Sequence, residues 1–131
     1  METIEVSFPG GKRVDAKVGG FSIQTDQPEK YGGGAGAPAP FELFLASLAT
    51  CAGIYAWNFC EMRNLSTEGL AMRMECRNDA QRKMIGEIRF CLTLPRGFPE
   101  KYRSGILRAM EQCAVKRHMQ EAPSFSLEVC P

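Results

Sequence analysis

Six cysteines are the side chains of this sequence that could do chemistry: Cys51, Cys60, Cys76, Cys91, Cys113 and Cys130. A cysteine thiolate can act as a nucleophile, a redox group or a metal ligand. No two of them form a C-x-x-C pair, and the only histidine is His118. This spacing does not indicate a zinc site, and we expect neither a metal nor a cofactor. The remaining question is which cysteines are structural and which are reactive.

The cellular compartment determines whether these thiols stay reduced or form disulfides. Residues 1–6 carry neither a basic segment nor a long apolar segment. We therefore expect no signal peptide and a cytoplasmic location, where thiols stay reduced and a structural disulfide framework is unusual. The length of 131 residues predicts a single domain, residues 1–131. A net charge of +1 gives no reason to expect a nucleic-acid or membrane partner.

The first 25 residues read as three antiparallel strands. Apolar and polar residues alternate over residues 4–8, 14–18 and 21–25, which predicts half-buried strands. The intervening turns are expected at Pro9-Gly10-Gly11 and at Gly19-Gly20. Residues 26–40 are rich in glycine and proline and show no periodicity. We interpret them as a close-packed connecting loop.

A long helix is expected from residue 40 to about residue 64, and it is apolar on nearly every side. Such a helix is either a core helix or a membrane span. The polar residues Glu42, Ser47, Thr50 and Asn58, and the amphipathic strands on both sides, favour the core helix. In so short a chain, a fully buried helix is most easily built if a second subunit covers it. The pattern therefore indicates a homodimer.

The second half of the chain also reads as strands followed by a helix. Residues 70–77 and 88–94 read as a hairpin with its turn at Asn78-Asp79. A helix is expected from Pro99 to about His118, and its apolar stripe is formed by Tyr102, Ile106, Met110 and Cys113. Phe125, Leu127 and Val129 predict a short final strand. The order β-β-β-α-β-β-α-β is that of an α+β domain.

These elements separate the cysteines into two groups. Cys60, Cys76, Cys91 and Cys130 each fit a small residue that fills a position, with Cys76 on the apolar face of its strand. Cys51 lies in the middle of the long helix, and Cys113 lies on the core-facing stripe of the second helix. Two such cysteines on helices that share one core can approach each other. A buried thiol is usually inert, so placement alone leaves both roles open.

Three segments carry a resemblance to the OsmC/Ohr family. Residues 40–51, PFELFLASLATC, resemble the family signature P-x-E-L-L-L-A-A-L-x-x-C. Residues 26–33, DQPEKYGG, resemble the D-x-P-x-x-x-G-G run of the OsmC-like branch, and Cys113-Ala114-Val115 resembles the family's C-P-V. The resemblance covers nearly the full length. It implies an α+β fold with central buried helices in an intertwined homodimer, and an active site at the subunit interface.

What the resemblance implies for chemistry is reduction of hydroperoxides by a thiol. Cys51 would attack the peroxide and become a sulfenic acid, Cys113 would condense with it to a disulfide, and an external dithiol would restore both. The apolar neighbours of Cys51 suit organic peroxides, which indicates a role in oxidative-stress defence. The alternative is a non-catalytic relative that binds a small apolar ligand or a partner in the dimer cleft.

The supporting residues depart from the family pattern. In the Ohr branch an arginine of the N-terminal strands lowers the pKa of the reactive thiol and is held by a glutamate; here Arg13 is the favoured candidate, with Lys12 second. Glu42 lies nine residues before Cys51, nearly opposite to it and about 13 Å away along an ideal helix. Glu42 could therefore act only across the dimer, or serve as a first-turn acid favoured by the helix dipole. Ala114 replaces the family's proline.

Overall fold

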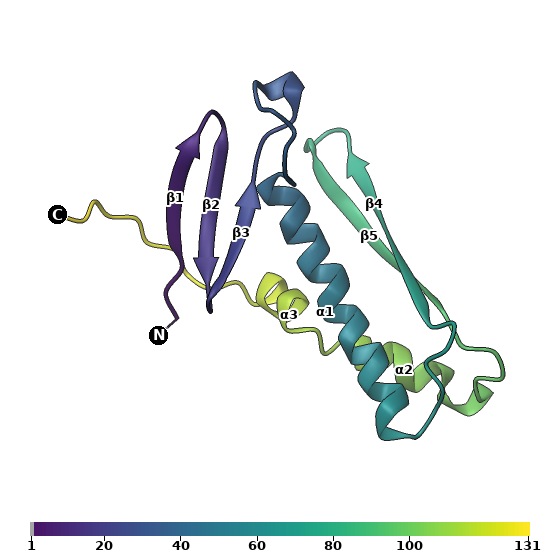
Figure 1. Ribbon diagram of the computed structural model, residues 1–131. Helices are drawn as coiled ribbons and strands as arrows, with labels where there is room; N and C mark the ends of the chain where they lie inside the picture. Colours follow the sequence, from purple (N-terminus) through teal and green to yellow (C-terminus); the bar gives the residue numbers. More distant parts are fainter. Residues whose placement is uncertain (1) are drawn as a thin grey trace. The chain divides into compact units, whose positions relative to one another are not determined.

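The computed structural model describes residues 2–131 and has two antiparallel sheets and three α-helices, as expected for an α+β protein (Figure 1). The chain divides into two compact units, one up to Ala46 and the other Ser47–Pro131. The boundary falls inside the long helix.

The sheet of the first unit is a three-stranded meander, as predicted. Strands β1 (Glu5–Gly10), β2 (Arg13–Val18) and β3 (Phe21–Thr25) pair antiparallel in that order. Both glycines of the β2–β3 turn have positive φ, 53° at Gly19 and 82° at Gly20, so this hairpin prediction is confirmed. The first turn comes later than predicted, because β1 continues to Gly10 through an irregularity in its register after Ser7.

The apolar residues of this sheet form only part of the half-buried face that alternation predicts, because those of β2 are half-buried whereas those of β1 and β3 are exposed. Phe8 is 79% exposed and Phe21 is 75% exposed, and all six residues of β1 are exposed. Period-two alternation reports which residues share a face, but it does not report what covers that face. The prediction of half-buried strands is therefore confirmed for β2 and wrong, in the single chain, for β1 and most of β3.

The connecting loop is organised by one buried carboxylate. Asp26 accepts hydrogen bonds from the backbone N–H groups of Gln27 (2.7 Å), Gly34 (3.4 Å) and Gly36 (3.1 Å). A Cβ atom on Gly33 would lie 2.0 Å from the carbonyl oxygen of Gln27. The close-packed loop is confirmed, and a short 3-10 turn, η1 (Glu29–Tyr31), interrupts it.

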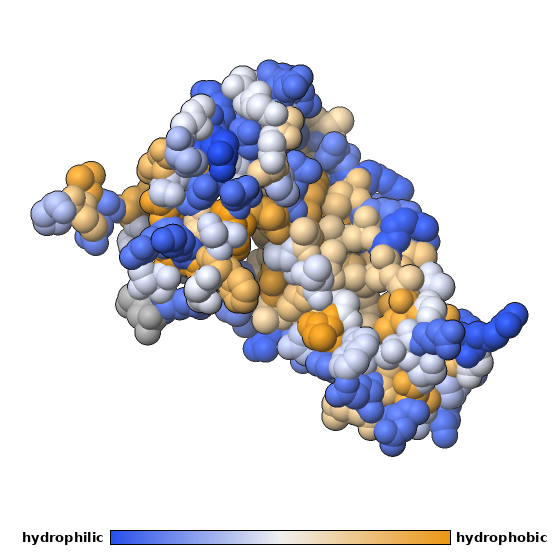
Figure 2. All heavy atoms as spheres, viewed as in Figure 1, coloured by the Kyte–Doolittle hydropathy of each residue, from blue (hydrophilic) through white to orange (hydrophobic). Residues whose placement is uncertain are grey.

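The long helix α1 runs over Pro40–Met62, close to the predicted range. Its buried residues recur at helical spacing: Leu48, Ala52, Ala56, Phe59 and Cys60. Its other side chains include Ile54 and Trp57, which are 49% and 42% exposed. Figure 2 shows how much hydrophobic surface the chain presents to solvent on one face. The helix is therefore buried along one stripe rather than on all sides.

Helix α1 is also long and apolar enough to span a membrane by length and composition. A single helix of this kind is weak evidence for a span, because core helices of soluble proteins pass the same test. The buried stripe along α1 is the pattern of a helix packed against other protein elements.

The second sheet is the hairpin of β4 (Ala71–Asp79) and β5 (Met84–Thr93). The predicted turn at Asn78-Asp79 is wrong, because both residues still pair with β5 and the turn follows them. The carboxylate of Asp79 accepts the backbone N–H groups of Gln81 (3.0 Å) and Arg82 (3.2 Å). Asp79 thus caps the turn as the last residue of its strand.

The core of the second unit lies where α1 meets the hairpin and the next helix, α2 (Arg103–Met110), which follows the 3-10 turn η2 (Glu100–Tyr102). Its buried residues are Ala52, Ala56, Phe59, Cys60, Ile106 and Met110. A Cβ atom on Gly105 would lie 3.1 Å from the ring of Phe59. Glycine therefore permits the close approach of α2 to α1.

The second long helix is broken, which corrects the sequence prediction. Helix α2 ends at Met110, and a separate helix α3 covers Ala114–Gln120 (Figure 1). Cys113 is not helical. It is the N-cap of α3, with φ −49° and ψ 122°. The apolar stripe through Cys113 identified the correct face of the core, because Cys113 is buried, but it did not identify the break.

The predicted final strand is wrong for the single chain. No strand is present after α3 in the described residues up to Pro131. Phe125 is 87% exposed, and Leu127 and Val129 are fully exposed. The alternation is real, but the segment makes no ladder with another strand of the same chain. The observed order is thus β-β-β-α-β-β-α-α with two short 3-10 turns.

Candidate dithiol site

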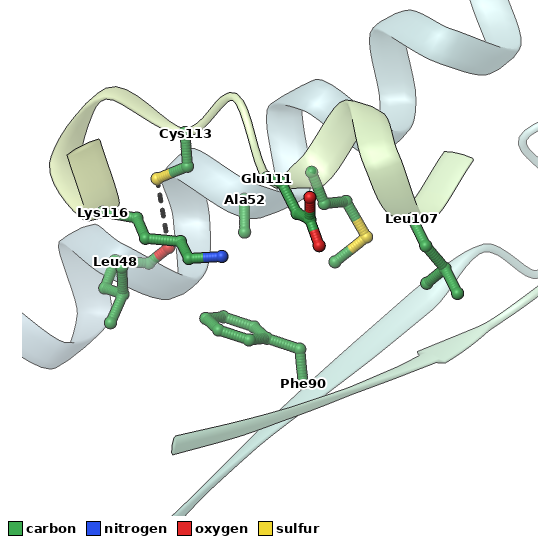
Figure 3. Close-up of a pocket in the computed structure, with 8 residues that line it drawn as sticks. Leu48, Ala52, Phe90, Leu107, Glu111, Cys113 and Lys116 are labelled. Atoms are coloured by element: carbon green, nitrogen blue, oxygen red, sulfur yellow. Dashed lines mark hydrogen bonds between the residues drawn. The ribbon is translucent and has the colours of Figure 1, made fainter. Parts of the chain in front are cut away.

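The structure brings Cys51 and Cys113 together within the second unit. Their side chains are hydrogen-bonded to each other, although they are far apart in sequence. Cys51 lies in α1 and is half-buried, whereas Cys113 is only 1% exposed. The Cys113 thiol also lies 4.0 Å from the carbonyl oxygen of Leu48, one turn before Cys51 (Figure 3). The proximity expected from two helices sharing one core is therefore present.

The environment of Cys51 favours its thiolate. Burial is the largest single influence and acts to raise the pKa of Cys51. Hydrogen bonds from the backbone N–H of Val115, from the Cys113 side chain and from the backbone N–H of Ala114 act in the opposite direction and together outweigh it. The pKa of Cys51 is therefore lowered, and this thiol is the better nucleophile at neutral pH.

Cys113 has the opposite character. Burial raises the pKa of Cys113, and so does the hydrogen bond that its thiol makes with Cys51. The backbone N–H groups of Lys116 and Val115 lower it only in part. Two adjacent thiols with pKa values moved apart divide the roles between them, because Cys51 loses its proton more readily whereas Cys113 retains its proton and can donate it.

The break between α2 and α3 provides the hydrogen-bond donors. In an unbroken helix, the N–H groups of Ala114, Val115 and Lys116 would bond to carbonyl groups four residues earlier. At the start of a new helix, these N–H groups have no intrahelical partner, and here they point to the two sulfur atoms. Nothing in the local sequence signals this break, because Gln112 and Ala114 are good helix formers.

A cavity of about 280 Å³ adjoins the pair. It is lined by Leu48, Ala52, Phe90, Leu107, Met110, Glu111, Cys113 and Lys116. Figure 3 shows the side chains of Phe90 and Lys116 directed into the space beside Cys113. Most of the lining is apolar, and Glu111 and Lys116 are its two charged residues. Sequence reasoning did not find Lys116. Its place three residues after Cys113 becomes informative only once the helix break is known.

The family of the chain follows from comparison with known proteins. The sequence matches the OsmC family model, described as OsmC-like protein, over residues 32–128. The chain belongs to the OsmC-like family. The matched interval contains Cys51, Cys113 and Glu42, whereas Arg13 lies before it. A search of the curated proteins found no significant match.

Solved structures agree in fold with this OsmC-like protein. A proposed osmotic stress induced and detoxification response protein from Psychrobacter arcticus 273-4 is similar with a TM-score of 0.75 at 21% identity, over 89% of this chain and 87% of that one. An OsmC like protein from Mycoplasma pneumoniae is similar with a TM-score of 0.72 at 16% identity, over 93% and 89%. At these identities the likeness shows the fold alone.

A third structure has a name that bears on chemistry. It is from Legionella pneumophila and is called an organic hydroperoxide resistance protein OsmC, predicted redox protein and regulator of sulfide bond formation. It is similar with a TM-score of 0.61 at 18% identity, over 92% of this chain and 89% of that one. These comparisons support an OsmC-like fold for this chain.

The two other predicted site residues belong to the first unit. Arg13 pairs with Asp15 at 3.5 Å, and its charge contributes to lowering the pKa of Asp26, after the backbone hydrogen bonds from Gln27 and the loop glycines. Glu42 accepts the backbone N–H of Ala39 at 3.1 Å. This is a cap at the start of α1, the structural role that the first-turn position suggests. A catalytic role for Arg13 or Glu42 remains a prediction.

The other cysteines and His118 lie in different surroundings from the pair. Cys60 has no exposed surface, and burial raises its pKa, which fits a structural residue. Cys76 was expected on an apolar face, but it is exposed, and so is Cys130. His118 is exposed. Within residues 2–131 there is no group of three or more His, Cys, Asp or Glu side chains placed to hold a metal ion.

Proposed function

We propose that this OsmC-like protein reduces organic hydroperoxides through Cys51 and Cys113. The Cys51 thiolate attacks the terminal oxygen of the peroxide, the O–O bond breaks, and the alcohol leaves with a proton while Cys51 becomes a sulfenic acid. The Cys113 sulfur then attacks that sulfur, a disulfide forms and water leaves. An external dithiol reduces the disulfide and is itself oxidised.

One observation carries this proposal. The Cys113 thiol hydrogen-bonds to the Cys51 sulfur, and that sulfur also receives two backbone N–H groups. The same arrangement stabilises the attacking thiolate and keeps a second thiol within reach of the sulfenic acid. Two buried cysteines that served only as core filling would not need shared hydrogen-bond donors.

The preference for organic peroxides is proposed from the neighbours of Cys51 in its own helix. Leu48 is buried and Tyr55 is half-buried, so the thiol is bordered by hydrocarbon and an aromatic ring. An alkyl tail gains by leaving water for such surroundings, whereas hydrogen peroxide has no tail to place there. The name of the Legionella relative is in accord with this choice.

We also propose that the working form is a cytoplasmic homodimer. The sheet of the first unit exposes Phe8 and Phe21, and α1 exposes Trp57 within the second unit. Large apolar side chains left open in this way are typical of surfaces that a partner covers. Sedimentation that reports only a monomer at micromolar concentration would contradict the dimer.

The cavity beside Cys113 also fits a second function, the binding of a small ligand without chemistry. A mostly apolar space of about 280 Å³ could hold a small apolar ligand in a protein that does no chemistry. A binding protein of that kind would bind its ligand equally well with serine at Cys51 and at Cys113. Peroxide turnover that depends on both thiols separates the two functions.

The test is turnover of cumene hydroperoxide with dithiothreitol as the reductant. We expect Cys51→Ser to abolish turnover. Cys113→Ser should remove the internal disulfide step, so that one equivalent of peroxide added before the reductant leaves Cys51 as a sulfenic acid. Cys76→Ser is the matched control. It removes an exposed thiol of β4 that belongs neither to the pair nor to the cavity lining, so the rate should be unchanged. No turnover in the unmodified protein, or equal turnover in Cys51→Ser, would rule out the proposal.

The same assay examines the predicted cation. Arg13→Gln should slow turnover at neutral pH if the guanidinium group assists Cys51, whereas the neighbouring Lys12→Gln should not. Equal rates in both variants and in the unmodified protein would remove Arg13 from the site and leave the backbone N–H groups as the source of thiolate stabilisation.

A further inference from the structure

We infer that the external thiol enters through the cavity and attacks the sulfur of Cys113, so that Cys51 is the thiolate released when the disulfide is reduced. The inference rests on the proposed dithiol cycle and adds to it the direction of its second half. The reductant could attack either sulfur of a disulfide, and the structure distinguishes between the two.

Access is the first argument: Cys51 is the more exposed of the two residues, but the cavity opens onto Cys113 alone. The cavity is lined by Cys113 but not by Cys51, although Leu48 and Ala52, on either side of Cys51 in α1, both line it. Cys113 is 1% exposed and is otherwise enclosed by the core, so this cavity is the approach to its sulfur. A volume of about 280 Å³ lies just below the range of roughly 300–1,000 Å³ typical of drug-sized ligands. It suits a slender thiol-bearing chain.

The leaving group is the second argument. In thiol–disulfide exchange, a sulfur that is better stabilised as a thiolate leaves faster. The backbone N–H groups of Val115 and Ala114 are already directed to the Cys51 sulfur. Attack at Cys113 therefore expels the sulfur for which the protein holds hydrogen-bond donors ready. Attack at Cys51 would expel Cys113, whose burial opposes the negative charge.

The charge of the incoming group is the third argument. The attacking species is a thiolate, which must enter a mostly apolar space. The side chain of Lys116 points into the cavity beside Cys113, and it is the one cation among the eight described residues that line it (Figure 3). Its ammonium group offsets part of the cost of bringing an anion there, and it also counters the carboxylate of Glu111, the one anion among the same eight residues.

A new S–S bond forms between the reductant and Cys113, the Cys51–Cys113 bond breaks, and its electron pair remains on Cys51 as a thiolate. The second thiol of the reductant then attacks its own sulfur in the mixed disulfide and releases Cys113. The reductant leaves as a disulfide, and two electrons have passed to the protein.

The test locates the mixed disulfide. The protein is oxidised with diamide, its remaining thiols are blocked with N-ethylmaleimide, and 2-mercaptoethanol is added for a short time before an acid quench. Newly released thiols are then labelled with heavy N-ethylmaleimide. Trypsin separates the two positions, because residues 109–116 contain Cys113 alone and residues 31–63 contain Cys51 with Cys60.

We expect mercaptoethanol on Cys113 and the heavy label on Cys51, in at least tenfold excess over the reverse. The reverse pattern, or equal amounts of the two, would overturn the inference. Because diamide forms the disulfide without a peroxide, this result is independent of turnover. Lack of peroxide turnover with the adduct on Cys113 would refute the proposed function alone.

A pair of variants tests the route. Leu107 lines the cavity and is half exposed, whereas the next residue, Arg108, is exposed and does not line it. We expect Leu107→Trp to slow reduction of the disulfide by dithiothreitol several-fold without slowing its formation by peroxide, and Arg108→Trp to change neither rate. Unimpeded reduction in Leu107→Trp, or an equal loss in both variants, would overturn the route.

Discussion

Helix α1 carries two cysteines, nine residues apart, in contrasting surroundings. Cys60 has no exposed surface, and burial raises its pKa although the charge of Arg63 acts to lower it. At Cys51 burial acts in the same direction, but hydrogen bonds from Val115, Cys113 and Ala114 reverse its effect. A nearby cation therefore does not activate a thiol by itself. At Cys51, hydrogen bonds from the backbone N–H groups at the start of α3 act to lower the pKa, and no cation is among the causes.

The largest expected difference is in reactivity toward an alkylating agent. At pH 7 we expect iodoacetamide to modify Cys51 on the order of 100-fold faster than Cys60, because Cys51 is both more ionised and more accessible. Both cysteines lie in one tryptic peptide, residues 31–63, so fragmentation of the singly modified peptide gives the ratio directly.

Unfolding supplies the control for this measurement. In guanidinium chloride the two rates should converge to within a few-fold, because the hydrogen bonds and the burial are both lost. Comparable alkylation rates for Cys51 and Cys60 in the folded protein would mean that the helix break does not distinguish the two thiols. That result would contradict the proposed contrast between them.

A smaller effect is expected when the donor from Cys113 is removed. Cys113→Ala takes away the thiol that hydrogen-bonds to Cys51, so the pKa of Cys51 should rise. The thiolate is the form present above that pKa, and a higher pKa leaves less of it at pH 7. Alkylation of Cys51 should therefore slow several-fold, and its pH profile should move to higher pH.

Serine at the same position is the matched comparison. Cys113→Ser keeps a hydroxyl group that can donate to Cys51, so its pH profile should move less than that of the alanine variant. Profiles of both variants that coincide with that of the unmodified protein would show that the contact between the two side chains does not influence Cys51.

The sequence predicted most of the fold, for identifiable reasons. Periodicity located α1 and the strands of both hairpins, and Gly19-Gly20 located a turn because both residues adopt positive φ. The same periodicity was misleading for Phe8 and for Leu127. It identified faces and an extended segment that nothing in the single chain covers.

The sequence predicted that Cys51 and Cys113 lie close together but not which groups surround them, and their catalytic role stays a prediction. The resemblance to the family singled out Cys51 and Cys113, and the structure joins them. The break before Ala114 could not be read from the sequence, because alanine and glutamine favour a continuous helix there. Tertiary contacts override local preference at this point, and Val115 and Lys116 act through their backbones, which side-chain patterns do not reveal.

The smallest effect, and the most specific, is expected from Ala114→Pro. Position 114 is the first residue of α3, where proline is well tolerated, and Cys113 before it is already extended with ψ 122°. Proline restricts the unfolded chain, which raises the free energy of unfolding by about 0.4–1 kcal/mol, but the loss of a hydrogen-bonded N–H acts against this, so we expect a net change below about 1 kcal/mol. It also removes the N–H that Ala114 gives to Cys51, the least of the three hydrogen bonds that lower that pKa.

The pKa of Cys51 should accordingly rise, with a smaller loss of alkylation rate than in Cys113→Ala. Urea unfolding and the pH profile of alkylation measure the two effects separately. Ala109→Pro, inside α2, is the control: it breaks a helix that is continuous and should lower the free energy of unfolding by roughly 3 kcal/mol. Destabilisation by Ala114→Pro as large as that of the control would mean that α2 and α3 behave as one helix in solution. In that case the backbone N–H groups of Ala114 and Val115 would bond to carbonyl groups within the helix and could not donate to Cys51.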